Sequence, residues 1–270
     1  MTYRAVFSDL DGTALNDRGS ISQENLDAIT ALHERGLLFI PTTGRSLYEI
    51  PTALLEHPHV RYYATSNGAA IYDKQEERFI TNDGIRGEQL RFLREQMARY
   101  TTMPIVHHNG YSYVPRQAYE NYRYYRVPEY YRTCGLNMHI LDDFDAEMAG
   151  YAEIEMISLF FRYDEEMAAF RQALQGFGGF QITASCEYAF EIIADGVNKG
   201  NALRALSDKL DIPLAETIAV GDSKNDITML DEAGYAVVMS NACDAAKAHA
   251  DLVICSNEEH GIDYLLHEVL

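Results

Sequence analysis

The sequence predicts an α/β protein in which a doubly wound parallel sheet is interrupted by an inserted α/β domain. Residues 3 to about 83 read as strand, helix, strand, helix and a short hairpin, and residues from about 190 onward resume alternating strands and helices. Between them, residues 83–186 combine alternating apolar stretches with amphipathic helices. We therefore expect a discontinuous core over residues 1–83 and 188–270, and an inserted domain over 84–187.

Two carboxylates follow the first predicted strand. The apolar run Arg4 to Ser8 reads as a buried strand, and the pentapeptide DLDGT follows at residues 9–13. Because residues two apart on an extended segment face the same way, Asp9 and Asp11 are expected to face one site. Gly12 permits a sharp turn. An ordinary Asp-Gly turn is the plain alternative, but two carboxylates at the mouth of a strand favour phosphate chemistry.

The helix that follows carries its own boundary signals. Ser20, with Gln23 three residues later, offers a capping box. Gly36 is expected to end the helix. The apolar residues at helical spacing are Leu26, Ile29 and Leu32.

The second predicted strand, residues 37–40, leads into a hydroxyl, a glycine and an arginine: Thr43, Gly44 and Arg45. A glycine lets the backbone approach an anion closely and offers an amide donor in a loop that leads into a helix. A plain turn between a strand and a helix is the alternative interpretation. The alternative predicts no special role for these three residues.

A lysine opens a later helix. Gly196 to Gly200 precedes the helical pattern Asn201 to Leu210, whose apolar residues share one face. Lys199 faces the positive end of the helix dipole there, which is locally unfavourable. The same position suits a cation that must meet an anion near helix amides. A solvated surface lysine is the alternative.

The last strand of interest is Ile218 to Val220, followed by GDSKND at residues 221–226 and a helix. Asp226 by itself fits an ordinary acidic residue in a first helical turn. Asp222 is harder to explain that way, because it follows an apolar strand. Since ligands of such sheets lie at the carboxyl ends of the strands, Asp222 is expected to join Asp9 and Asp11 at one rim.

These four segments, in this order, resemble the motifs of the haloacid dehalogenase superfamily of hydrolases. Over nearly the whole chain the sequence is similar to the Cof-type sugar-phosphate phosphatases, whose type IIB α/β cap is inserted where residues 84–187 lie. The segment SNGA at residues 66–69 is similar to the N-G-A segment of that branch, although locally Asn67-Gly68 is just a turn. Small departures are Ala14, where leucine is common, and Asn198, where serine or threonine is common.

The resemblance implies a two-step phosphoryl transfer. It makes Asp9 the nucleophile and Asp11 the general acid and base. Arg45 is a possible substrate contact. The groups implied to bind phosphate are Lys199, Thr43, Asn225 and the amides of Leu10 and Gly44. The implied direct metal ligands are the Asp9 carboxylate, the Asp11 carbonyl and the Asp222 carboxylate, with Asp226 acting behind them or through water.

An acidic cluster of this kind needs a cation. Carboxylates brought close together repel and raise one another's pKa. A site with only a few protein oxygen ligands fits Mg²⁺, which keeps several waters and typically takes one or two carboxylates plus substrate phosphate. The motifs provide no thiolate and imidazole set for zinc. The expected cofactor is therefore Mg²⁺.

The composition agrees with an intracellular, cytoplasmic enzyme. The formal net charge of −19 argues against a nucleic-acid partner. There is no basic amino terminus leading into an apolar stretch, and no apolar run approaches the ~20 residues of a membrane span. The cysteines are scattered and are expected to be buried free thiols, which indicates a reducing compartment: Cys134, Cys186, Cys243 and Cys255. The sequence gives no indication of the oligomeric state.

Three alternatives stay open. A run of tyrosines and arginines at residues 116–132 could stack on single-stranded nucleic acid, although packing of the inserted domain is the simpler explanation. A phosphomutase of the same superfamily uses the same core. A phospho-Asp receiver, which is a switch, also has an aspartate, a lysine and Mg²⁺, but it needs neither the Asp11 acid and base nor an inserted domain. The resemblance implies a small phosphorylated metabolite as the substrate, without identifying which one.

Overall fold

The computed structural model describes residues 3–133, 137–183 and 188–270. The chain forms two compact units. Unit 1 contains Met1–Thr81 and Asn198–Leu270, and unit 2 contains Asn82–Val197. The mixed α/β class predicted from the sequence is confirmed.

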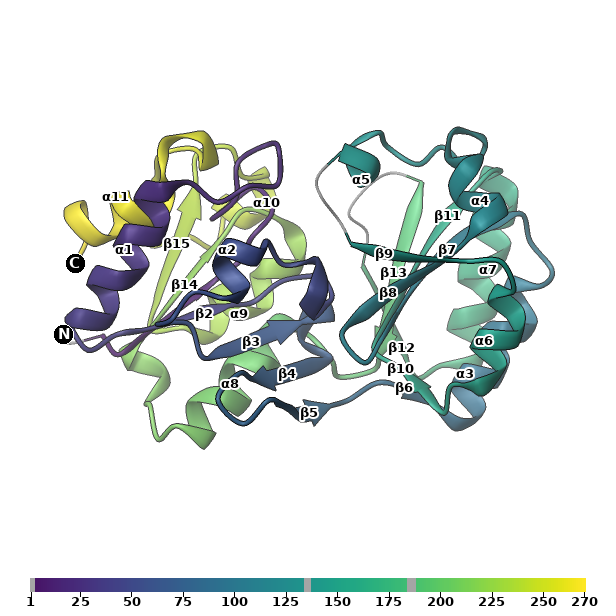
Figure 1. The fold of residues 1–270 in the computed structure, drawn as a ribbon, viewed down its shortest axis with the longest axis horizontal. Helices are drawn as coiled ribbons and strands as arrows, with labels where there is room; N and C mark the ends of the chain where they lie inside the picture. The colour runs from purple at the N-terminus through teal and green to yellow at the C-terminus, as the bar shows by residue number, and fades with distance from the viewer. Residues whose placement is uncertain (1–2, 134–136, 184–187) are drawn as a thin grey trace. The chain divides into compact units, whose positions relative to one another are not determined.

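Unit 1 is built on a five-stranded sheet with the order β16-β15-β14-β1-β2, in which each neighbouring pair is parallel (Figure 1). Its strands are β1 (Ala5–Ser8), β2 (Leu38–Pro41), β14 (Thr217–Gly221), β15 (Tyr235–Met239) and β16 (Leu252–Ile254). A second sheet has the order β3-β4-β5, and its strands are β3 (Tyr62–Thr65), β4 (Ala70–Asp73) and β5 (Arg78–Asn82). The parallel sheet agrees with the predicted fold class.

Helices cover both faces of this sheet. The helices are α1 (Gln23–Glu34), α2 (Thr52–Leu55), α8 (Lys199–Lys209), α9 (Ile227–Glu232), α10 (Asp244–Lys247) and α11 (Gly261–Glu268). Short 3₁₀ turns are η1 (Leu47–Glu49), η2 (Ser66–Gly68), η4 (Leu214–Glu216), η5 (Lys224–Asp226) and η6 (Asn257–Glu259). On one face Val6 packs with α1 and α11, and on the other Phe7 packs with α8 and α9. Because successive strand residues point to opposite faces, Val6 and Phe7 contribute to different core clusters, and all four residues of β1 are buried.

Helix α1 begins at a different cap from the predicted one. The N-cap is Ser22, whose hydroxyl accepts from the Asn25 amide, so the predicted capping box at Ser20 was wrong. Ser22 has the extended backbone that an N-cap needs immediately before the first helical residue. The other end follows prediction: Gly36 has a φ of 82°, and Leu37 donates its amide back to the Leu32 carbonyl.

Unit 2 contains a six-stranded sheet with the order β12-β13-β11-β7-β8-β9 (Figure 1). Its strands are β7 (Thr102–His108), β8 (Tyr111–Pro115), β9 (Met138–Leu141), β11 (Met156–Phe161), β12 (Phe180–Thr183) and β13 (Ala189–Ala194); β6 (Ile85–Arg86) pairs separately with β10 (Glu153–Ile154). The helices are α3 (Gly87–Met97), α4 (Arg116–Glu120), α5 (Tyr130–Thr133), α6 (Phe144–Gly150) and α7 (Asp164–Phe177), with the turn η3 (Tyr122–Tyr125). Apolar residues of α3, α6 and α7 pack together with residues of this sheet in one core cluster.

The second boundary between the units differs from the expected one at residue 188. Strand β13 pairs antiparallel with β11 and β12, so it belongs to the sheet of unit 2. The alternating pattern of unit 1 therefore resumes at Asn198, the N-cap of α8, and not at about residue 190. A lone apolar strand carries no signal of which sheet it will join, and this explains the ten-residue difference.

The tyrosine-rich segment packs largely against unit 2 itself. Tyr122 is buried in a cluster with Ile105 and Phe160, and three further tyrosines pack on this cluster: Tyr119, Tyr125 and Tyr131. Tyr124 is 45% exposed, and the Arg162 guanidinium lies 4.7 Å from its ring centroid. The packing interpretation of these tyrosines is confirmed for the ones in this cluster.

Among the residues that the structure describes, no helix is long and apolar enough to cross a membrane. Cys243 and Cys255 are free thiols, as expected, but both are partly exposed, so the prediction that they are buried was wrong. Cys134 and Cys186 lie outside the described residues.

Candidate active site

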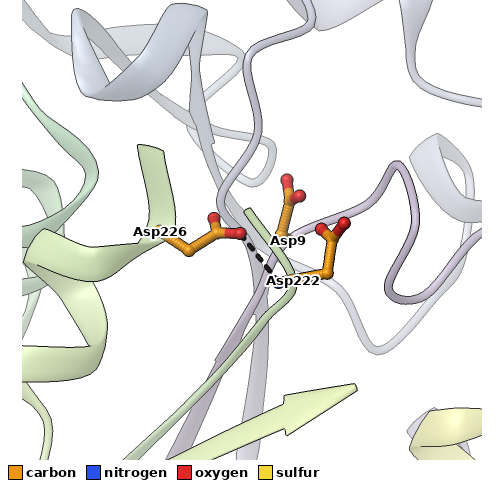
Figure 2. A group of neighbouring side chains, drawn as sticks. All are labelled: Asp9, Asp222 and Asp226. Atoms are coloured by element: carbon orange, nitrogen blue, oxygen red, sulfur yellow. Dashed lines mark hydrogen bonds between the residues drawn. The ribbon is translucent and has the colours of Figure 1, made fainter. Parts of the chain in front are cut away.

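The carboxyl ends of β1 and β14 bring two aspartates together. The strands are parallel neighbours, with Ser8 opposite Val220, and the Asp9 amide donates to the Val220 carbonyl at 2.9 Å. Asp9 immediately follows Ser8, the last residue of β1, and Asp222 immediately follows Gly221, the last residue of β14. Their carboxylates lie side by side, with Asp226 close to them (Figure 2). The site therefore lies where ligands of parallel α/β sheets bind.

Lys199 is fully buried between two of these acids. Its Nζ atom lies 2.7 Å from Asp9 Oδ1 and 2.7 Å from Asp226 Oδ1. Burial by itself lowers the pKa of this lysine, but the two carboxylates outweigh it and raise the pKa above its ordinary value. Asn198 caps the helix by accepting from the Asn201 amide, so this departure from the family pattern keeps the capping function. Lys199 is thus a permanent cation beside Asp9.

Asp226 is occupied by contacts within the protein. Its other oxygen, Oδ2, accepts from the amides of Asp222 and Ser223, both at 2.9 Å, and the side chain is fully buried. One of these bonds is drawn in Figure 2. Gly221 makes room for the Asp226 side chain, because a Cβ at position 221 would lie 2.6 Å from the Asp226 Cβ. Asp226 therefore fixes the backbone that presents Asp222, and it fixes Lys199.

The turn after Asp11 fits closely against Asp222. Gly12 has a φ of 75°, and a Cβ at this position would lie 2.6 Å from Asp222 Oδ2. Thr13 donates its hydroxyl to Asp222 Oδ1 at 3.2 Å. The glycine is therefore required twice, for its backbone conformation and for its lack of a side chain.

Without a bound metal ion the acids destabilise one another's charged forms. Burial, followed by the charge of Asp226, raises the pKa of Asp9 well above its ordinary value, against the opposing effect of Lys199. Burial and Asp226 raise the pKa of Asp222 to about 6. Lys199 supplies one positive charge to three close carboxylates, so the group has an unbalanced negative charge.

The residues present fit a divalent cation that prefers oxygen ligands. Across the described parts of the chain, the group with metal-ligand spacing is Asp9, Asp222 and Asp226, whose ligand oxygens lie within 4.8 Å of one another. Since Asp226 already binds Lys199 and two amides, Asp9 and Asp222 are the carboxylates left to hold an ion. The group contains no thiolate or imidazole, so its chemistry suits Mg²⁺ better than zinc.

This geometry predicts how the stability of the metal-free protein depends on pH. A carboxyl whose pKa folding raises stabilises the folded state below its unfolded pKa, here 3.8, and this contribution is lost as the pH rises to about 6. We expect Asp222 to lower the free energy of unfolding by roughly 2–3 kcal/mol between pH 4 and pH 7. Urea unfolding of chelator-treated protein across this range measures it. An Asp222→Asn variant with the same pH slope would contradict the assignment.

Asp11 does not join the three acids but pairs with Arg45. Arg45 Nη2 lies 2.6 Å from Asp11 Oδ1, and Nε lies 2.8 Å from Oδ2, in a two-point contact. Arg45 also donates to the Glu49 carbonyl at 2.8 Å and is 5% exposed. Arg45 was predicted as a possible substrate contact, but its guanidinium binds the Asp11 carboxylate.

The expected phosphate-binding groups lie on three loops of unit 1. Thr43 is buried after β2, and its hydroxyl accepts from the Arg45 amide at 3.1 Å. Leu10 is fully buried between the two aspartates of the first motif. Gly44 faces Asn67, and Asn225 donates to the same Asn67 side chain at 3.0 Å.

Asn67 is a site residue that sequence reasoning missed. Its neighbourhood reads locally as a turn, and nothing in the residue pair Asn67-Gly68 indicates contact with positions 44 and 225. The available signal was the resemblance of SNGA to a family segment. The structure gives that segment a physical function as a contact point for two other loops.

Comparison with known proteins shows which family the chain matches. Residues 6–266 match the family model of the haloacid dehalogenase-like hydrolases. The phosphatase YwpJ of Bacillus subtilis is 28% identical over 289 aligned positions, which cover 99% of this chain and 100% of that protein. The 5-amino-6-(5-phospho-D-ribitylamino)uracil phosphatase YcsE of the same organism is 29% identical, covering 96% and 92% of the two chains.

A solved structure supports the fold independently. The subclass IIB sugar phosphatase BT4131 superposes with a TM-score of 0.82 at 23% identity, covering 97% of each chain. Together with the family match over almost the whole sequence and the motifs at the ends of β1, β2 and β14 and at the start of α8, this shows that the chain belongs to the haloacid dehalogenase-like hydrolases and is a phosphatase of that family.

Proposed function

We propose that the protein is a Mg²⁺-dependent phosphatase of small phosphorylated metabolites, such as sugar phosphates, that works through a phosphoaspartyl intermediate on Asp9. The observation that carries the proposal is the buried Asp9 carboxylate, which lies 2.7 Å from Lys199 and beside Asp222 at the carboxyl end of the sheet. A carboxylate held this way is fixed in orientation and stays close to cations that attract a phosphoryl group.

Asp9 acts first. One of its oxygens forms a bond to phosphorus while the bond from phosphorus to the leaving oxygen breaks, and Asp11 gives that oxygen its proton. Asp11 then takes a proton from water, whose oxygen bonds to phosphorus as the bond to Asp9 breaks. Lys199, Thr43, Asn225 and the amides of Leu10 and Gly44 bind the remaining phosphoryl oxygens.

Asp9 and Asp222 would hold the metal ion, with the Asp11 carbonyl as a third ligand. When bound, the ion supplies positive charge that offsets the repulsion between carboxylates and phosphate. Asp226 contributes by holding the backbone amides of Asp222 and Ser223, so the loop that carries Asp222 keeps its shape as the ligands change.

The substrate class is supported by the relatives and by charge. YcsE is named for a phosphorylated ribitylamino compound, and BT4131 is described as a sugar phosphatase. The formal net charge of −19 disfavours long-range attraction of a polyanion such as nucleic acid. A small monoester meets mainly the local cations of the site, so we propose a small-molecule substrate and no nucleic-acid partner.

The test is phosphate release from a panel of sugar phosphates, nucleotides and an aryl phosphate. We expect turnover with Mg²⁺, its loss on chelation, and its return when Mg²⁺ is added back. Release of orthophosphate without any bisphosphate activator separates a phosphatase from a phosphomutase. Labelling that stops at one phosphate per protein would support the receiver alternative. Absence of release from every compound would contradict the proposal.

Arg45 gives a sharper test of how Asp11 is held. Replacing Arg45 with lysine keeps the charge but removes the two-point contact. If Arg45 positions Asp11, kcat falls about tenfold or more while KM changes little, because the interaction contributes mainly in the proton-transfer step. If Arg45 binds substrate, KM rises instead. Steady-state kinetics of Arg45→Lys separates these, with the exposed Arg78→Lys as the matched control.

A further inference from the structure

The Ser66–Gly68 turn is buried and held in an unfavourable backbone conformation. Ser66 and Asn67 have φ values of 52° and 56°, and Gly68 follows at 94°. Left-handed backbone is uncommon for residues other than glycine, and two in succession persist only where the surroundings impose them. Ser66 is fully buried and Asn67 is 2% exposed, so this turn is not an ordinary surface turn.

Backbone hydrogen bonds tie the turn to the loop after β2. The Ser66 amide donates to the Arg45 carbonyl, and the Asn67 amide donates to the Thr43 carbonyl, both at 2.9 Å. The Thr43 amide in turn donates to the Ala64 carbonyl at 2.9 Å. The loop that carries Thr43 and Gly44 is therefore fixed by this turn and by the end of β3.

The Asn67 side chain reaches two groups that the proposed function assigns to phosphate. Its Oδ1 accepts from Asn225 Nδ2 at 3.0 Å, and it lies 3.2 Å from the position that a Cβ on Gly44 would occupy. Ser223 donates its hydroxyl to the side-chain oxygen of Asn225, Oδ1, at 2.5 Å. Asn225 is thus held at both ends of its carboxamide.

The turn also contacts the start of α8. A Cβ on Gly68 would overlap the backbone carbonyl of Asn198, the residue before Lys199. Gly68 is therefore required for the close approach of this turn to the helix. Three segments that carry proposed phosphate-binding groups meet at one three-residue turn.

We propose that Asn67 is a positioning residue that aims the Asn225 carboxamide at the phosphate, with the strained turn as its support. Glycine is the residue that adopts this backbone most readily. An asparagine here keeps the less favourable conformation and adds one acceptor oxygen, which Asn225 uses. The inference rests on the proposed function, because it assigns Asn225 to phosphate.

The test is Asn67→Gly, which relaxes the backbone and removes the acceptor. We expect kcat/KM to fall at least tenfold and the inhibition constant for inorganic phosphate to rise at least tenfold, while the thermal midpoint shifts by no more than about 4 °C. Asp211→Gly is the matched control: Asp211 is an exposed residue of unit 1 with a φ of 52°. It relaxes a similar backbone strain and leaves phosphate inhibition unchanged.

A double-mutant cycle isolates the contact. In an Asn225→Ala background, residue 67 has no carboxamide at position 225 to contact. Adding Asn67→Gly to this background is therefore expected to change the inhibition constant for phosphate by less than about threefold. If the fold-change in the double variant equals the product of the two single fold-changes, Asn67 acts independently of Asn225. That result would overturn the inference.

A second substitution covers the case in which Asn67→Gly does not fold. Asn67→Asp tolerates the left-handed backbone and keeps the acceptor, but it adds a negative charge beside Gly44 and Asn225. It is expected to weaken phosphate inhibition at least tenfold. Native inhibition in every folded variant at Asn67 overturns the inference. Absence of both turnover and phosphate inhibition in the unsubstituted protein contradicts the proposed function instead.

Discussion

Replacing Asp9 with asparagine is expected to reduce kcat at least about a thousandfold, because the amide lacks the charge and the nucleophilic oxygen that form the covalent intermediate. The substitution preserves size and the β1 backbone contact to Val220. Acid quenching during turnover of a phosphate-labelled substrate should trap labelled protein with the native chain and none with Asp9→Asn.

Asp208→Asn is the matched control for this experiment, since Asp208 is an exposed aspartate on α8. It removes one negative charge from unit 1 without touching the site, and it should turn over like the native chain. Equal activity of Asp9→Asn and Asp208→Asn would mean that Asp9 is not the nucleophile.

Replacing Lys199 with methionine should affect stability as well as activity. The substitution leaves Asp9 and Asp226 buried without their shared cation, and breaking a buried ion pair in this way costs roughly 3–5 kcal/mol. Catalysis should also fall at least about a hundredfold, because a cation at the phosphoryl group is lost. Urea unfolding and phosphate release measure the two effects separately.

A second substitution makes this prediction specific to charge. Adding Asp226→Asn to Lys199→Met removes one of the two unpaired carboxylates, so the double variant should be more stable than Lys199→Met alone. Lys209→Met, an exposed lysine at the end of the same helix, should change stability by less than about 1 kcal/mol. A double variant less stable than Lys199→Met would show that packing, not charge, determines the loss.

The parallel core and the meeting of Asp9 with Asp222 could be predicted because both depend on one-dimensional signals. A polar residue that ends a buried apolar strand must lie at the carboxyl edge of a parallel sheet, and neighbouring strands share that edge. The position of Lys199 at the start of a helix could also be predicted from the sequence pattern. In each case local pattern and global fold require the same placement.

The parts that could not be predicted depend on which segments meet in space. Strand β13 joins unit 2 through its pairing with β11, a choice that its own residues do not encode. Arg45 could have faced a substrate or a carboxylate, and its contact with Asp11 follows from side-chain packing. Asn67 reads as a turn until its neighbours Gly44 and Asn225 are known.

The sheet order has a consequence for the sequence of events during synthesis. Strand β1 is made first, but its neighbour β14 begins at Thr217, and the contiguous unit Asn82–Val197 is translated between them. While the ribosome adds that unit, β1 can pair on its β2 side but has no β14 to pair with. The intervening unit can fold as soon as it emerges, because all its strands lie within one segment. The aspartates at the ends of β1 and β14 therefore meet only after the intervening unit has been made, and a nascent chain truncated before Thr217 carries Asp9 without Asp222.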